Sequence, residues 1–145
     1  MDLLVSNIGW ILLLFTVIII FFYKRISNNP DAMTSKFKTG RKTKVDSISM
    51  RPIIKEALKN SGFKKIGFDV DENRFYAKTR FSMSSWSEYV EVKIDRSQNE
   101  TEIEFKSICA LPTQIYDWGK NKRNYNKFES ELKKLLPIGK RMVSL

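Results

Sequence analysis

A long apolar run near the N-terminus is the strongest pattern in the sequence. No charged residue lies between Leu3 and Tyr23. A helix of about 20 such residues spans the hydrocarbon core of a bilayer, which is about 30 Å thick. A cleaved signal peptide would have a basic start and a small-x-small cleavage site. This chain has Asp2 at its start and Lys24-Arg25 directly after the run. We therefore predict a transmembrane anchor over residues 1–25.

The segment that follows the anchor has no sustained apolar period. Residues 26–47 are rich in Asn, Ser, Thr and Lys. Such a composition buries too little apolar surface to offset the entropy of an ordered chain. It predicts a flexible basic linker.

A helical period then begins. Ile53, Ile54, Ala57 and Leu58 form one apolar stripe, which predicts a helix that starts near Ser49 as its N-cap and stops at Gly62.

The period changes to two beyond Gly62. Alternating apolar positions predict four half-buried strands separated by short, turn-rich spacers, and short spacers favour antiparallel neighbours. The inward positions are Ile66, Phe68 and Val70; Phe75, Ala77, Thr79 and Phe81; Val90, Val92 and Ile94; and Ile103, Phe105 and Ser107.

A second amphipathic helix closes the pattern over residues 124–136, and Pro137 ends it. The predicted fold class is therefore α+β. We expect a two-layer sandwich over residues 48–137, in which two helices cover a four-stranded antiparallel meander in the order α-β-β-β-β-α. Residues 138–145 are predicted to be a loose tail.

Composition restricts the chemistry. The chain has no His and one Cys, so it lacks the usual acid/base group of neutral pH and forms no internal disulfide. We expect neither a metal nor a cofactor. Lys and Arg number 26 against 16 Asp and Glu, and many of the positive residues follow the apolar run. The positive-inside rule then predicts an external N-terminus and a cytoplasmic domain.

The net charge of +10 does not by itself predict nucleic-acid binding. Much of this charge lies in the linker, and the outer strand face carries Glu91, Glu102 and Glu104. Only Tyr76 and Tyr89 are available there to stack on bases. We expect no nucleic-acid partner.

The connection between the last strand and the last helix is unusually rich in chemistry. Asp117 and Gly119 suit a tight turn, and Asn121 is a candidate N-cap. Helix N-termini attract anions. The candidate anion site comprises Lys120, Asn121, Lys122 and Arg123. Cys109 is predicted to be buried and unreactive, because no His is present to activate it.

The stretch from Ser107 to Arg123 also resembles a known closing motif. A widespread family of small bacterial and plastid domains has Ser-x-Ser, a short gap and Asp-x-Gly-x-Asn with an Arg close behind. The matching positions, with an earlier Thr-Arg pair, are Thr79, Arg80, Ser107, Asp117, Gly119, Asn121 and Arg123. The resemblance implies a shared fold and a shared site at Ser107, Asp117, Asn121 and Arg123. It implies no activity.

Two hypotheses about function follow. The first is a non-enzymatic, membrane-tethered binding or adaptor domain, with anionic lipid or a membrane protein as its partner. The second is an enzyme or small-ligand carrier with a site around Asp117, Asn121, Arg123 and Arg80.

Overall fold

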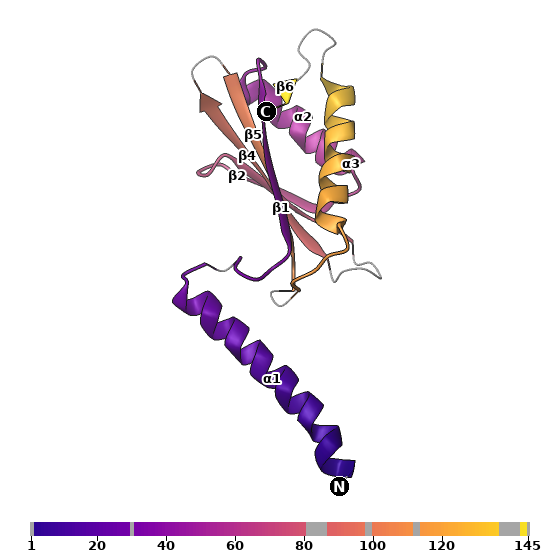
Figure 1. The fold of residues 1–145 in the computed structure, drawn as a ribbon. Helices are drawn as coiled ribbons and strands as arrows, with labels where there is room; N and C mark the ends of the chain where they lie inside the picture. The colour runs from indigo at the N-terminus through magenta and orange to yellow at the C-terminus, as the bar shows by residue number, and fades with distance from the viewer. Residues whose placement is uncertain are drawn as a thin grey trace.

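The computed structural model of the chain describes residues 2–29, 31–80, 87–97, 100–111, 114–136 and 143–144. The first element, α1 (Asp2–Ile26), is a long helix that lies apart from the rest of the molecule (Figure 1). Its segment Asn7–Ile26 is long and apolar enough to cross a membrane, and almost all of it is exposed.

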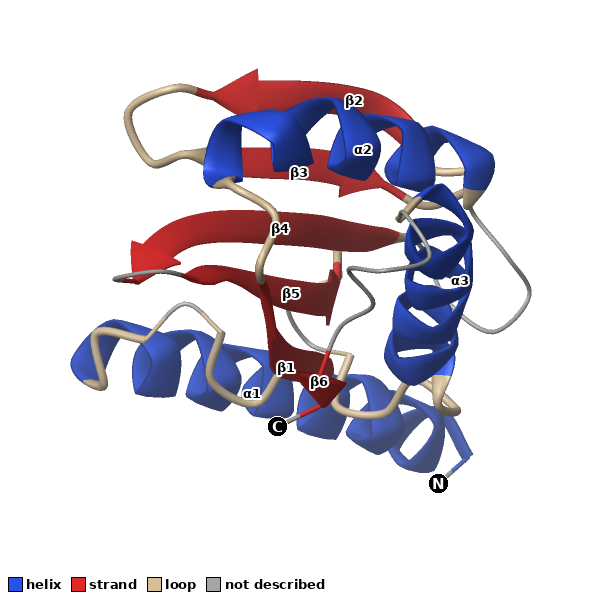
Figure 2. Ribbon diagram, turned by 90° about the horizontal axis from the view of Figure 1, so that it is seen from above, coloured by secondary structure: helices blue, strands red, loops and turns tan. Residues whose placement is uncertain are grey.

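An antiparallel sheet with two helices on one face forms the remainder (Figure 2). The helices are α2 (Ser47–Asn60) and α3 (Lys120–Leu135). The strands lie in the order β2 (Lys64–Asp69), β3 (Arg74–Lys78), β4 (Glu88–Ser97), β5 (Glu100–Cys109), β1 (Lys36–Thr43) and β6 (Val143–Ser144). The predicted α+β class and the apolar N-terminal helix are confirmed, and β2 to β5 form the expected meander. Val70, which we expected to face inward, follows the end of β2 and is 72% exposed. The predicted positions of Phe81 and Pro137 lie outside the described residues.

The number of strands differs from the prediction. Within the segment 26–47, where we expected a flexible linker, β1 pairs with β5 along its whole length, from Lys36 opposite Ile108 to Thr43 opposite Thr101. In the expected loose tail, Val143–Ser144 adds β6 to the other edge of β1. The prediction failed because β1 alternates weakly: of its inward side chains only Phe37 is apolar. Backbone pairing with β5 forms the strand in place of a hydrophobic period.

The start of α2 also lies earlier than predicted. The side chain of Asp46, and not that of Ser49, caps the helix by accepting hydrogen bonds from the backbone N–H groups of Ile48 (3.1 Å) and Ser49 (2.9 Å). At the other end Gly62 has a φ of 81°, as expected of a helix stop that requires the left-handed region.

The core lies between the helices and the sheet. Interlocking side chains from both layers are fully buried. They hold α3 over β5 and β1, and α2 over β4 and β2. They include Met50, Ile54 and Leu58 from α2, Phe128 and Leu132 from α3, and Val90, Val92, Ile94 and Phe105 from the sheet.

Candidate functional site

A cluster of polar side chains lies inside the core where the sheet meets α3. We call Thr79, Glu88, Ser107, Asn121 and Asn124 the buried polar cluster. Glu88 has no exposed surface, and Ser107, Asn121 and Asn124 are also buried. Fully buried carboxylates are rare in proteins and require hydrogen-bond partners.

Hydrogen bonds connect the members of the cluster in a chain. The Thr79 hydroxyl donates to the Glu88 carboxylate, which also accepts from Asn124 Nδ2 at 3.2 Å. Asn124 Nδ2 lies 3.1 Å from Ser107 Oγ, and the Ser107 hydroxyl donates to Asn121 Oδ1 at 2.7 Å. The cluster therefore joins β4, β5 and the residue that follows β3 to the first turns of α3.

Asp117 holds the corner that leads into α3. Its carboxylate accepts hydrogen bonds from the N–H groups of Gly119 (3.0 Å) and Asn121 (2.6 Å). Gly119 occupies the N-cap position with a φ of 72° and makes no side-chain cap bond. Asp117 thus does the capping that we predicted for Asn121.

The N-cap prediction for Asn121 was wrong because the helix period places Asn121 on the same face as Asn124, Phe128 and Leu132. Its side chain is 1% exposed and points inward. Asn121 Nδ2 donates to the Ser35 carbonyl at 3.0 Å and lies 3.6 Å from the Cys109 sulfur.

The structure brings part of the family-motif set together. Thr79, Ser107 and Asn121 belong to the buried polar cluster, and Asp117 contacts it through the Asn121 backbone. Arg80 is exposed and lies outside the cluster. Arg123 is also exposed, and its Nη1 donates to the Trp118 carbonyl at 2.6 Å.

The side chains of the candidate anion site do not converge on a single binding position. Lys122 and Arg123 are exposed, whereas Asn121 faces the interior. The Asp117 carboxylate already accepts from two N–H groups at the helix start. An anion at this helix terminus would compete with that carboxylate.

Sequence reasoning missed Glu88 and Asn124. The sequence nevertheless contains a periodic pattern that places each of them on the core face. Glu88 lies two residues before Val90 on the strand, so a period of two places it on the core face. Asn124 lies four residues before Phe128 on the buried face of the last helix.

The buried polar cluster has the character of a structural connector. Its members satisfy one another, and Asn121 adds the Ser35 carbonyl. Among the residues whose placement is described, no group of three or more His, Cys, Asp or Glu side chains is arranged to hold a metal ion.

A second polar contact lies between β1 and α3. Arg41 forms an ion pair with Glu129 and donates from Nε to Tyr125 Oη at 2.8 Å. Lys133 approaches the same carboxylate at 2.7 Å. Burial opposes ionisation of Glu129, but the hydrogen bonds from Lys133 and Tyr125 and the charge of Arg41 outweigh it and lower the pKa of this carboxyl. The charged side chains therefore hold β1 against α3.

Cys109 is buried at the end of β5, as predicted. Burial raises the pKa of its thiol, and the carboxylates of Asp117 and Glu88 add to this effect against the hydrogen bond from Asn121. We expect native protein at pH 8 to react with iodoacetamide about tenfold or more slowly than unfolded protein, because only an accessible thiolate reacts. Mass spectrometry of the alkylated chain measures both rates.

An exposed thiol provides the control for that experiment. Ile48 is 73% exposed on α2, so the Ile48→Cys chain should take up one label rapidly and a second slowly. Equal rates at both positions in the native state would contradict the burial of Cys109.

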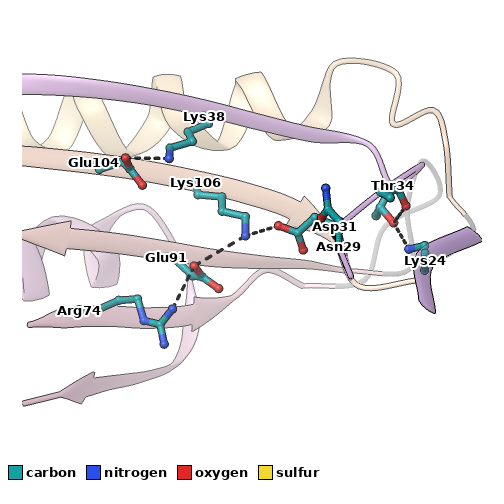
Figure 3. Close-up of polar contacts among 10 residues, drawn as sticks. Lys24, Asn29, Asp31, Thr34, Lys38, Arg74, Glu91, Glu104 and Lys106 are labelled. Carbon is teal, nitrogen blue, oxygen red and sulfur yellow. Dashed lines mark hydrogen bonds and ion pairs between the residues drawn. The ribbon is translucent and has the colours of Figure 1, made fainter. Parts of the chain in front are cut away.

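The connector between α1 and β1 is bound to the domain (Figure 3). Lys24, in the last turn of α1, donates to Thr34 Oγ1 at 2.6 Å. Asp31 pairs with Lys106 of β5 at 2.5 Å. The Ser35 N–H donates to the Gln114 carbonyl at 2.8 Å, and the Ser35 carbonyl accepts from the Cys109 N–H at 3.0 Å. These contacts fix the connector to one end of the sheet.

The helix-free face of the sheet carries alternating charges. The Glu91 carboxylate of β4 lies 3.4 Å from the Arg74 guanidinium of β3 and 3.9 Å from the Lys106 ammonium of β5. Lys106 in turn pairs with Asp31 (Figure 3). Lys38 of β1 pairs with Glu104 of β5 at 2.8 Å. Cross-strand charge pairing accounts for this face without a ligand.

Comparison with protein-family models and with curated proteins gives no match for this chain. The family resemblance at the Ser107–Arg123 stretch therefore stays a prediction.

Proposed function

We propose that this chain is a single-pass membrane protein that holds a small binding or adaptor domain at the cytoplasmic surface of the bilayer. Its partner is an anionic lipid or a membrane protein. The bound connector carries this proposal: Lys24, Asp31 and Ser35 tie the end of α1 to the domain within a few residues. A domain held so close to the end of its anchor has the membrane surface as its nearest environment.

Charge supports the proposed orientation. Lys24 and Arg25 lie in the last turn of α1, and further positive residues follow in β1. Positive residues next to a spanning helix favour the cytoplasmic side, where anionic lipids attract them.

The enzyme or carrier hypothesis has less support from the geometry. Asp117 and Asn121 are turned to the corner and the interior, while Arg80 and Arg123 are exposed. The cavity between β1, β5 and α3, about 10 Å³ in size, is lined by Arg41, Phe105, Tyr125 and Glu129 among others and by none of these four residues.

Reporter fusions test the proposed topology. One reporter that works only in the cytoplasm and one that works only outside it are fused in turn after Leu145. We expect activity from the cytoplasmic reporter alone, in a membrane fraction that resists carbonate extraction. Activity from the external reporter, or release of the chain by carbonate, would contradict the proposal.

Cross-linking in intact membranes distinguishes the two partner classes. Photoreactive lipid that labels the domain supports a lipid partner. A discrete protein adduct supports a membrane-protein partner.

A further inference from the structure

The corner between β5 and α3 displays large apolar side chains to its surroundings. Ile115, Tyr116 and Trp118 are 59%, 65% and 68% exposed. The Tyr116 and Trp118 rings meet edge to face, with centroids 5.0 Å apart. We call residues 115–118 the aromatic corner. Adjacent exposed aromatic side chains are typical of a surface that contacts a partner or a membrane.

Backbone contacts hold the aromatic corner in place. Trp118 has a φ of 51°, which is uncommon for a bulky residue. Its carbonyl accepts the bond from Arg123, and the Asp117 side chain next to it accepts from the Gly119 N–H. The Trp118 ring is therefore presented by a defined turn, although the ring itself does not pack in the core.

The aromatic corner lies near the end of α1. Gln114, which directly precedes the corner, accepts a hydrogen bond from Ser35. The neighbouring Thr34 accepts a hydrogen bond from Lys24 in the last turn of α1. In Figure 1 the connection between β5 and α3, drawn in orange, lies at the end of the domain that faces α1. The corner is thus placed at the level where a spanning α1 leaves the bilayer.

We infer that the aromatic corner inserts into the interfacial layer of the bilayer and forms a second membrane contact of this chain. The inference rests on the proposed function, because it requires α1 to span the membrane. Trp and Tyr concentrate at the boundary between headgroups and acyl chains, since they have an apolar body and a polar tip. Exposed Lys122 and Arg123 follow in the first turn of α3, where anionic headgroups would attract them.

This contact fixes the orientation of the domain. The bound connector holds the domain near the end of α1 at one place, whereas α1 and the aromatic corner together define two points on the bilayer. The end of the sheet where α2 begins then faces away from the membrane, because Thr43, just before α2, lies at the opposite end of β1 from Lys36.

Quenching by brominated lipids tests the insertion directly. The chain contains Trp10, Trp86 and Trp118. The full-length variant Trp10→Phe/Trp86→Phe, reconstituted in nanodiscs of neutral and of anionic lipid, reports on Trp118 alone. We expect blue-shifted emission and loss of most of the Trp118 fluorescence when the lipid acyl chains are brominated near the headgroup. Bromine quenches only at close contact, so proximity without insertion gives no such loss.

A matched variant controls for nonspecific contact. Ile48 is as exposed as Trp118 but lies at the start of α2, away from the connector. The variant Ile48→Trp/Trp10→Phe/Trp86→Phe/Trp118→Phe should emit unquenched in the same nanodiscs. Tyr116→Ser in the Trp118 reporter chain should weaken the quenching, while the near-UV circular dichroism of the domain stays unchanged.

Each outcome separates this inference from the proposed function. Trp118 that remains unquenched and open to acrylamide in lipid of both kinds overturns the insertion, and points to a protein surface as the occupant of the corner. If the same protein still resists carbonate extraction with a cytoplasmic C-terminus, the membrane-anchored function stands. Release by carbonate overturns both.

Discussion

Replacing Glu88 by Ala should destabilise the domain by about 2–4 kcal/mol. The change removes the acceptor for Thr79 and Asn124, whose buried polar groups then lack a partner, and it leaves a void beside Ser107. For a domain of this size each kcal/mol lowers the melting temperature by about 4–8 °C. Thermal unfolding of the full-length protein in detergent, followed by near-UV circular dichroism, measures the shift.

Two further variants serve as controls for the Glu88→Ala result. Glu88→Gln keeps the volume and one acceptor oxygen, so we expect a smaller loss. Glu104→Ala removes a carboxylate from the next strand, but from the outer face, where its pair with Lys38 is largely exposed. Exposed pairs contribute about 0–1 kcal/mol. A Glu88→Ala protein no less stable than the Glu104→Ala protein would show that the buried polar cluster does not stabilise the fold.

Loss of the Glu129 charge should cost about 1–3 kcal/mol at pH 7, because charge-assisted hydrogen bonds contribute in this range. The Glu129→Gln change weakens the contact of α3 with Arg41 of β1 and removes the pair with Lys133. Urea unfolding of the full-length protein in detergent, compared with wild type, gives the difference in free energy. Glu131→Gln on the same helix is the control, since its partner Lys134 is exposed.

The Glu129 effect should depend on pH. The folded structure holds the pKa of Glu129 below its ordinary value of 4.5. The carboxylate therefore stabilises the folded state above that ordinary value, and this stabilisation is lost as the pH falls through the folded pKa. The difference between wild type and Glu129→Gln should shrink from pH 7 toward pH 3. A constant difference over this range would show that the charge of Glu129 is not its cause.

Hydrophobic patterning was sufficient to predict the three helices and the meander. α1 is apolar but exposed, whereas α2, α3 and the strands β2 to β5 turn an apolar stripe to the core. Each element was expected near its observed position. β1 was missed because Thr39, Arg41 and Thr43 occupy inward positions with Phe37. Its place is set by pairing with β5, and a partner so distant in sequence leaves no local pattern.

The candidate site was predictable in position but not in composition. The Ser107–Arg123 stretch does contain polar side chains that the fold brings together. Asn121 was expected as a cap, since Asn is common there, but Asp117 caps from two residues before Gly119. Glu88 joins the cluster through Thr79 and Asn124, which lie on different elements. That contact forms only when α3 packs on the sheet, so no local sequence pattern indicates it.

The position of β1 has a consequence for the order of folding. β1 is the first strand after α1, yet its partners are β5 and β6, which are synthesised last among the strands. Pairing over such a long sequence separation is slow, because a large loop must close first. In a nascent chain α1 is therefore complete well before the sheet can close. Both edges of β1 then stay open until β5 and β6 have been synthesised, so the sheet closes only after the rest of the meander is complete.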